Sequence, residues 1–326
     1  MDVEEIVALS VKHNVSDLHL CSDSPPRWRR AGRLEPAPFP PPDVEALLKA
    51  WLNDEQQGAW WASGQVDFAV TVAGNQRLRG SAFRHMQGVS IALRLLPLAC
   101  PQLSTLGVPR TIPALLCNDD GLILVTGATG SGKSTTLAAM VDFLNHHTDG
   151  HILTLEDPVE FRYQSERCLI QQREIGQHSP SFAEALRSAL REDPDVILLG
   201  ELRDSETIRL ALTAAETGHL VLATLHTRGA AQAIERLVDI FPAQEKDPVR
   251  NQLAGSLRAV LAQKLRQDVQ GGRVALYELL VNTPAAANLI REGKTWQLPG
   301  IIQTGQQAGM QNFEQSLAER RAQGRL

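Results

Sequence analysis

Residues 127–134 are the stretch that most constrains what this chain can fold into. They read Gly-Ala-Thr-Gly-Ser-Gly-Lys-Ser and fit the pattern G-x-x-x-x-G-K-[S/T]. A short apolar segment at 122–125 precedes them, and residues 135–141 read as a helix. This strand–loop–helix order is that of a phosphate-binding loop, in which glycines let backbone N–H groups turn toward a phosphate and the helix N-terminus adds positive charge.

The pattern assigns roles to the side chains of this loop. Lys133 would reach the β- and γ-phosphates, and Ser134 would offer its hydroxyl to Mg²⁺. The alternative is a glycine-rich turn that binds nothing, but three glycines, a lysine and a serine in register favour a nucleoside triphosphate site. The predicted nucleotide-binding residues of the loop are Gly127, Ala128, Thr129, Gly130, Ser131, Gly132, Lys133, Ser134 and Thr135.

Composition and charge exclude several classes of protein. With 326 residues, 43% of them hydrophobic, the chain has room for about two domains with packed cores. A net charge of −5 provides no overall basic field for nucleic acid. One group of arginines surrounds Trp28 and reads as the solvated face of a hairpin. Its members are Arg27, Arg29, Arg30 and Arg33.

Cysteine usage and hydropathy point to the cytoplasm. The four cysteines are scattered and include no C-x-x-C pair, which argues against a structural zinc and against a disulfide framework. The first 20 residues carry five charged side chains, so they do not form a signal peptide. No apolar run approaches the roughly 20 residues that cross a bilayer. We expect a cytoplasmic protein without direct membrane insertion.

The pattern of the chain changes near residue 100. Residues 1–100 predict an α+β domain, because three of its runs alternate as in an antiparallel sheet with one wet face. Proline-rich residues 101–114 predict a linker. Residues 115–265 predict a nucleotide-binding core with a mostly parallel α/β sheet, since strands and helices alternate there. Residues 266–326 are predicted to be mostly helical.

One further helix is expected within the predicted core. Asp247 and Pro248 read as its N-cap and first residue. The apolar residues assigned to this helix are Val249, Leu253, Leu257 and Leu261.

Three predicted strands of the core end in reactive side chains, and the carboxyl ends of parallel strands face the ligand crevice. Glu201 follows four apolar residues past a glycine and could hold Mg²⁺ through water. His226 ends another strand and could contact the γ-phosphate. Glu156, Asp157 and Glu160 follow a third strand, and a carboxylate there could orient the attacking water. Spacing alone does not say which of the three does so, and a charge run is also typical of a solvated loop.

Two arginines, Arg79 and Arg94, lie on predicted strands of the N-terminal domain. An arginine delivered from another domain or subunit can stabilise the charge of a phosphoryl-transfer transition state. Exposed strand arginines are also ordinary, so the residues themselves leave this role open. A role for His219, which begins the strand that His226 ends, is equally open.

The order of these motifs resembles that of the secretion-superfamily ATPases, and most closely that of the PilT-type retraction ATPases of type IV pili. The most specific stretches read ILTLEDPVEF (152–161), FAEALRSALREDPDVILLGELRD (182–204) and ETIRLALTAAETGHLVLATLHT (206–227). The resemblance implies that Glu160 is the catalytic glutamate and Glu201 the Walker B acid. It also implies that His219 and His226 are the histidines of the His box, with His219 among the nucleotide-binding residues.

The same resemblance implies a PAS-like N-terminal domain, a RecA-like P-loop core and a homohexameric ring. ATP and Mg²⁺ would lie at a cleft between domains, and arginines of the N-terminal domain would approach the phosphates. The ring would meet a pilus or secretion platform protein at the inner membrane, and nucleic acid would not be a partner. The predicted catalytic residues are Lys133, Glu160, Glu201, His226, Arg79 and Arg94, with Ser134 and Glu201 at the metal.

The chain also departs from the resembled family. Gln87 stands where the family often has an arginine, which Arg84 could replace. In the C-terminal motif AIRNLIRE, Ala286 and Ala287 stand in place of isoleucine and arginine. The chain lacks the tetracysteine cluster that is typical of assembly and type II secretion ATPases, which favours the retraction branch.

These observations predict Mg²⁺-dependent ATP hydrolysis by a hexameric ring motor that powers type IV pilus retraction or a related machine. Two alternatives are a pseudopilus-assembly ATPase of type II secretion and a nucleotide-binding interaction protein with little turnover. A nucleic-acid motor is a third alternative, which the acidic pI of 6.0 disfavours.

Overall fold

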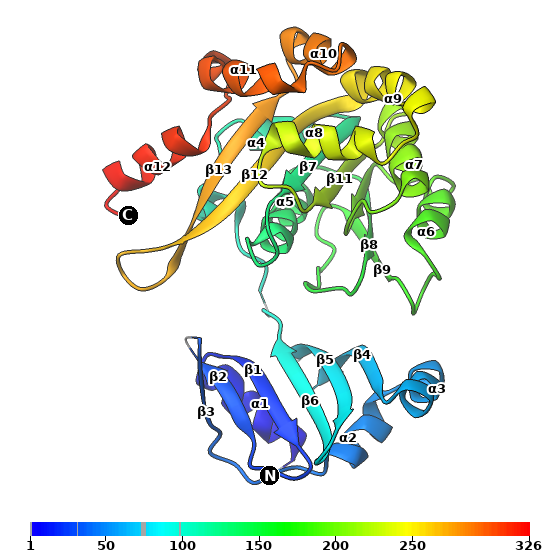
Figure 1. Cartoon of the computed structure of the whole chain (residues 1–326), viewed down its shortest axis with the longest axis vertical. Coiled ribbons are helices and arrows are strands. Elements are labelled where there is room, and N and C mark those ends of the chain that lie inside the picture. Colours follow the sequence, from blue (N-terminus) through cyan, green and yellow to red (C-terminus); the bar gives the residue numbers. More distant parts are fainter. Residues whose placement is uncertain (1, 31, 73–75, 98) are drawn as a thin grey trace. The chain divides into compact units, whose positions relative to one another are not determined.

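A computed structural model describes residues 2–30, 32–72, 76–97 and 99–326. The chain divides into two units, each with its own apolar core (Figure 1). One unit comprises Met1–Ala99 together with the short segment Glu160–Arg162. The other unit comprises Cys100–Val159 and Tyr163–Leu326.

The first unit is an antiparallel sheet with strand order β3-β2-β1-β6-β5-β4. Leu18 pairs with Leu93 across β1 and β6, and both side chains are buried in the core. Arg79 pairs with Arg94 across β5 and β6, and both side chains are exposed. The predicted antiparallel sheet with one polar face is confirmed. Its elements are α1 (Val3–Lys12), β1 (Val15–Cys21), β2 (Arg27–Arg30), β3 (Arg33–Pro36), α2 (Val44–Trp51), α3 (Asp54–Ser63), β4 (Gln65–Val72), β5 (Gln76–His85) and β6 (Gly88–Leu95).

The second unit is built on a mixed sheet with strand order β13-β12-β7-β11-β10-β8-β9. Neighbouring strands are parallel, except that β12 and β13 form an antiparallel hairpin. The predicted fold class, an α/β core with a mostly parallel sheet, is confirmed. The strands are β7 (Gly121–Thr126), β8 (His151–Glu156), β9 (Leu169–Glu174), β10 (Val196–Leu199), β11 (Leu220–Leu225), β12 (Leu257–Gln267) and β13 (Arg273–Val281).

Helices cover both faces of this sheet (Figure 1). Alternate residues of β7 point into different apolar layers: Leu122 and Leu124 into one, Ile123 and Val125 into the other. Burial on both faces explains why β7 reads as an uninterrupted apolar run. Among the described helices, none combines the length and apolar character that a membrane span requires. The helices are η2 (Leu103–Leu106), α4 (Ile112–Leu116), α5 (Lys133–His147), α6 (Phe182–Ala189), α7 (Ser205–Glu216), α8 (Ala230–Asp239), α9 (Ala243–Ser256), α10 (Pro284–Arg291), η3 (Thr295–Gln297), α11 (Leu298–Thr304), η4 (Gln306–Ala308) and α12 (Phe313–Ala322).

The prediction of a helix that carries Leu257 and Leu261 is wrong for the C-terminal half of that helix. The helix α9 ends at Ser256, and both leucines lie on β12. Their spacing of four fits a helix, but β12 lies between β7 and β13, where a strand is buried on both faces. Such a strand reads as a continuous apolar run, so periodicity does not distinguish it from a helix. The helix also begins earlier than expected, so that Pro248 lies inside it.

Two predicted domain boundaries fall inside packed structure. The predicted linker, residues 101–114, contains η2 and the start of α4, and its residues Leu103 and Ile112 are buried in the core of the second unit. The predicted boundary after residue 265 falls within β12. The region expected to be mostly helical also contains β13, which completes the sheet.

Candidate active site

The predicted phosphate-binding loop, residues 127–134, follows β7 directly, and its last two residues, Lys133 and Ser134, begin α5. Its glycines adopt φ angles that favour glycine: +156° at Gly127, +77° at Gly130 and +91° at Gly132. A Cβ atom at Gly127 would lie only 2.4 Å from Ser131 Oγ, whereas nothing lies within 4 Å of one at Gly130. Conformation therefore excludes other residues at Gly130, and both conformation and space exclude them at Gly127.

The remaining residues of the predicted nucleotide-binding set differ in exposure. Ser131 is buried, and within the described residues its hydroxyl has no hydrogen-bond partner. Thr135 is half-buried in the first turn of α5. The exposed members of the set are Ala128, Thr129, Gly130 and Ser134.

Lys133 is buried at the first position of α5. Its Nζ donates hydrogen bonds to the carbonyl oxygens of Gly127 (2.8 Å) and Ala128 (3.1 Å). It also lies 3.2 Å from Nδ1 of His226. These acceptors are uncharged, whereas a phosphate oxygen carries negative charge and attracts the ammonium by direct Coulomb interaction. A phosphate group would therefore bind the ammonium more strongly than the carbonyl groups of the loop do.

A line of contacts connects Lys133 with the ends of β10 and β11. His226 follows β11, and its Nε2 lies 3.1 Å from Glu201 Oε1. Glu201 follows β10 and accepts a 2.7 Å hydrogen bond from Arg203 Nε. Because Lys133 donates to Nδ1, the imidazole proton is carried by Nε2, which donates to Glu201. The structure thus brings together three of the predicted catalytic residues, the loop lysine, the histidine and the Walker B acid.

The electrostatics of this cluster keep Glu201 ionised. Burial acts to raise the pKa of the Glu201 carboxyl, but contacts with Arg203 and His226 outweigh it and hold the pKa below its usual value. The hydrogen bond to Glu201 raises the pKa of Arg203, and the nearby charge of Asp157 adds to this effect. Glu201 is therefore a carboxylate anion just after the end of β10, and the His226 side chain lies between it and Lys133.

Two threonines hold the carboxyl ends of β7 and β11 together. Thr126 Oγ1 lies 2.7 Å from Thr227 Oγ1 and accepts a 2.9 Å hydrogen bond from the Thr227 backbone N–H. Both residues directly adjoin site residues, because Thr126 precedes the loop and Thr227 follows His226. This contact therefore fixes the histidine beside the loop.

The three acidic candidates after β8 have different surroundings. Glu156 ends β8, and its Oε1 accepts hydrogen bonds from Thr154 Oγ1 (2.7 Å) and Gln172 Nε2 (3.3 Å). Asp157 is exposed, and Glu160 is half-buried. The contacts of Glu156 favour a structural role for that residue, and the catalytic role of Glu160 stays a prediction.

The structure places His219 away from this cluster, and its nucleotide-binding role stays a prediction. His219 directly precedes β11, and its Nδ1 lies 3.1 Å from the carbonyl oxygen of Ala214. His226 follows the opposite end of the same strand. At about 3.3 Å per residue, the strand puts roughly 20 Å between the two histidines. A parallel strand presents only its carboxyl end to the loop that follows β7.

The predicted arginines belong to the first unit, and their roles stay predictions. Arg94 forms a 3.0 Å ion pair with Asp17 on the neighbouring strand β1. Arg84, considered as a replacement for the arginine missing at Gln87, lies over the rings of Trp60 and Trp61 at 4.9 and 5.5 Å. These aromatic contacts already engage the Arg84 side chain.

Sequence reasoning missed Gln263, a buried residue of β12 that contacts the loop. Its Nε2 donates a 2.5 Å hydrogen bond to the carbonyl oxygen of Ser131. The available signal was an amide directly after the apolar run 259–262. Because a helix was predicted over these residues, the amide could not be assigned to a strand beside the loop.

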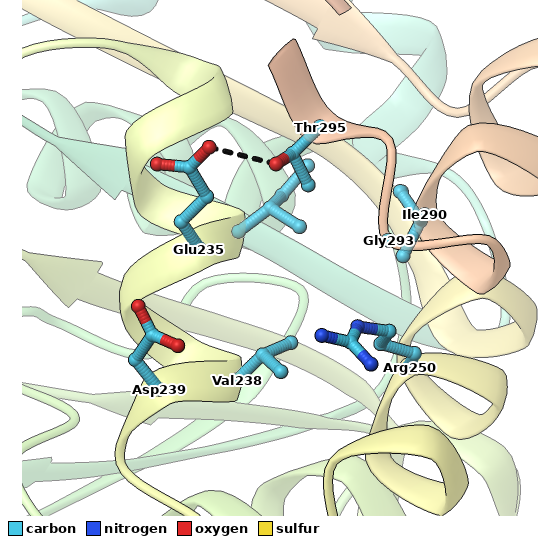
Figure 2. Close-up of a pocket in the computed structure, with 8 residues that line it drawn as sticks. Glu235, Val238, Asp239, Arg250, Ile290, Gly293 and Thr295 are labelled. Carbon is cyan, nitrogen blue, oxygen red and sulfur yellow. Dashed lines mark hydrogen bonds between the residues drawn. The ribbon is translucent and has the colours of Figure 1, made fainter.

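A second concave site lies elsewhere in the second unit and carries none of this chemistry. Figure 2 shows a pocket of about 50 Å³ in which Glu235 accepts a 2.7 Å hydrogen bond from Thr295. The cation in its lining, Arg250, is paired with Asp247 at 2.6 Å. Its remaining lining residues are Ile234, Val238, Asp239, Ile290 and Gly293. The pocket shares no residue with the predicted nucleotide site.

Comparison with known proteins agrees with this geometry. Residues 62–270 match the family described as "Type II/IV secretion system protein". The chain is 74% identical over 326 residues to the "Uncharacterized protein YggR" of Escherichia coli (strain K12), covering all of both chains. It is 48% identical over 320 residues to the "Type IV pilus retractation ATPase PilT" of Pseudomonas aeruginosa, covering 97% of this chain and 93% of that protein.

A solved structure is similar along the whole chain. The structure titled "Crystal Structure of the Pilus Retraction Motor PilT and Bound ADP" matches with a TM-score of 0.92 and 42% sequence identity. The match covers 100% of this chain and 94% of that one. The similarity therefore includes both units and the loop between β7 and α5.

Proposed function

The chain belongs to the family of type II/IV secretion system proteins, and we propose that it is the ATPase of a ring motor that powers type IV pilus retraction or a related machine. The observation that carries the proposal is the contact line from Lys133 through His226 to Glu201. In γ-phosphoryl transfer to water a loop lysine can stabilise the charge of the phosphates, and a carboxylate nearby can hold the metal ion that does the same. The relative named as a retraction ATPase and the motor structure with bound ADP support the same activity.

We also propose that the nucleotide binds with Mg²⁺, and the residues present fit this ion. Mg²⁺ prefers oxygen ligands and keeps several waters. Glu201 offers a carboxylate, and Ser134 offers an exposed hydroxyl in the first turn of α5. The ion would neutralise phosphate charge. Within the described part of the chain, His, Cys, Asp and Glu side chains form no group of three or more that could hold a metal ion without the nucleotide.

In this mechanism the residues of the chain exchange partners when the nucleotide binds. Lys133 leaves the carbonyl oxygens of its own loop for the phosphates, to which its charge is better matched. His226 stays between Lys133 and Glu201. Its Nε2–H group donates a hydrogen bond to the Glu201 carboxylate, which holds that side chain in place. Glu160 would orient the attacking water as the catalytic glutamate, as the family resemblance implies.

We expect the substitution Arg203→Gln to lower the Mg²⁺ concentration for half-maximal turnover by about two- to fivefold. The guanidinium competes with the metal for Glu201, and its side chain is 67% exposed, where an ion pair contributes only ~0–1 kcal/mol. A Mg²⁺ titration at saturating ATP measures the effect. Arg209→Gln, which breaks the exposed pair with Glu245, is the matched control. A raised Mg²⁺ requirement in the Arg203 variant would show that the arginine assists the site instead.

We further propose a homohexameric ring in which Arg79 and Arg94 act on the nucleotide of another subunit. The ring would work in the cytoplasm at an inner-membrane platform protein, without direct membrane insertion or nucleic-acid binding. A site completed in trans is active only in the assembled ring, which couples turnover to subunit rearrangement.

Turnover measured across a dilution series tests this arrangement. The rate per subunit is expected to rise with protein concentration, because dilution separates the subunits that complete each site. Mixing Glu160→Gln with the double variant Arg79→Gln/Arg94→Gln should restore part of the activity that each lacks alone. Restoration is expected only if the glutamate and the arginines of different subunits meet. If no mixing ratio restored turnover, Arg79 and Arg94 would act on the nucleotide of their own subunit.

A second candidate is a nucleotide-binding interaction protein with little turnover. The observation that favours it lies on α10, where Ala286 and Ala287 replace the isoleucine and arginine of the family motif. Both alanines are buried, at 0% and 6% exposure, so the helix packs closely where the family carries larger side chains. Single-turnover measurement decides: a wild-type rate no faster than that of Glu160→Gln would favour this candidate over the motor.

A further inference from the structure

We infer that Gln263 is a positioning residue of the nucleotide site, through which β12 holds the phosphate-binding loop in shape. This inference rests on the nucleotide site proposed above. Gln263 lies 132 residues from Ser131 in the sequence and is 2% exposed. It is a buried amide on β12, directly after the buried apolar residues 259–262.

Both ends of the Gln263 amide are engaged at the junction of loop and helix. Nε2 donates to the carbonyl oxygen of Ser131 at 2.5 Å, and Oε1 accepts from Thr136 Oγ1 at 2.8 Å. Ser131 lies in the loop, and Thr136 lies in the first turn of α5. A single side chain therefore joins the two segments that would have to surround a phosphate.

The backbone of Gln263 also contacts the loop. A Cβ atom at Gly127 would lie 2.6 Å from the carbonyl oxygen of Gln263, and one at Gly132 would lie 3.1 Å from its Nε2. Close approach to β12 therefore requires glycine at Gly127 and leaves little room for a Cβ atom at Gly132, in addition to the φ angles of both residues. The loop is built against this strand.

The partner strand supports the opposite side of the site. Glu278 on β13 accepts a 2.9 Å hydrogen bond from the backbone N–H of Ala230, the first residue of α8. That helix follows His226 by a short turn. The β12–β13 hairpin therefore contacts both the phosphate-binding loop and the segment that carries the histidine.

The Ser131 carbonyl group depends on the Gln263 amide for a hydrogen-bond donor. Without the Gln263 amide that oxygen would lose its buried donor, and the peptide could rotate to find another partner. Rotation would turn neighbouring N–H groups away from the phosphate-binding direction. The amide therefore selects the loop conformation that binds a nucleotide, which lowers the cost of ordering on binding.

The test compares Gln263→Met with Gln311→Met in the full chain. Gln311 donates its amide to the carbonyl oxygen of Tyr277 at 3.0 Å, so it supports the same hairpin without touching the loop. We expect the dissociation constant for a fluorescent ATP analogue to rise roughly 5- to 50-fold in Gln263→Met, which loses two hydrogen bonds, and to stay within twofold of wild type in Gln311→Met. The rise in unfolding temperature on adding ATP should shrink in the first variant only.

A second variant keeps the test valid if Gln263→Met does not fold. Thr136→Val removes the donor to Gln263 Oε1 and a hydrogen bond to Tyr277 but keeps the bond from Gln263 to Ser131, so a smaller loss of affinity is expected. In the double variant the losses should be less than multiplicative, because both act through one contact. The inference would be overturned if Gln311→Met lost as much affinity for the ATP analogue as Gln263→Met. It would also be overturned if neither Gln263→Met nor Thr136→Val lost any affinity. Either result would leave the proposed nucleotide site standing. A wild-type chain that binds no nucleotide would overturn both.

Discussion

Replacing Lys133 with alanine is expected to lower ATP turnover by at least roughly 10²–10³-fold, the cost of removing one charge-stabilising donor from an active site. The ammonium is the cation that the structure holds inside the loop, within 3.2 Å of the loop carbonyl oxygens and His226. Its loss would also weaken ATP binding, because the loop itself would then offer the phosphates only its backbone N–H groups and the positive charge of the helix N-terminus. Turnover and binding of a fluorescent ATP analogue, measured together, check both effects.

The matched control for this variant is Lys246→Ala. Lys246 also makes a 2.7 Å ion pair, with Asp239, but lies on α9 away from the loop. Its replacement should leave turnover near the wild-type value. If Lys133→Ala retained more than a tenth of wild-type turnover in a folded protein, the loop would not be the catalytic phosphate site.

Replacing Glu160 with glutamine is expected to lower turnover by about 10²–10⁴-fold while ATP binding stays near wild type. An amide cannot accept the proton of the attacking water, and general-base catalysis contributes about this factor. Binding should survive because the phosphates are held by the loop and its lysine. Single-turnover hydrolysis and equilibrium binding distinguish the two quantities.

Glu156→Gln and Asp157→Asn are the matched controls for this assignment. Glu156 already accepts hydrogen bonds from Thr154 and Gln172, so its replacement should change turnover only severalfold. Asp157 is exposed and adds to the field at Arg203. If either control abolished turnover while Glu160→Gln retained it, the catalytic acid would be that residue and the role carried over from the family would be wrong.

Much of the site was predictable because its parts are local in sequence. The loop, the strand before it and the helix after it span 27 residues, from Gly121 to His147. Glu201 and His226 were predicted because each directly follows an apolar strand, and parallel strands bring their carboxyl ends to one edge. The structure confirms that these two side chains meet. It also shows that His219, at the other end of the same strand, does not join them.

Other parts of the site could not be predicted, because they depend on which strands become neighbours. Arg203 and Thr227 contact site residues through geometry that no local pattern marks. Gln263 was hidden because the run around Leu257 and Leu261 fits a helix as well as a strand. Its true state follows from pairing with β7 and β13, which is a long-range event.

By itself the sequence determined the phosphate-binding loop, the α/β class and the strands that lead into the loop and into Glu156, Glu201 and His226. Glycine placement and apolar runs act on neighbouring residues, so they can be read without knowledge of the fold. Only the tertiary structure decided that β12 lies beside β7 and lends Gln263 to the loop, and that Lys133, His226 and Glu201 form one line. Their contacts join residues that lie 25 to 132 positions apart in the sequence. A strand that is buried on both faces shows no alternation of apolar and polar residues, so the sequence does not reveal which strands become its neighbours.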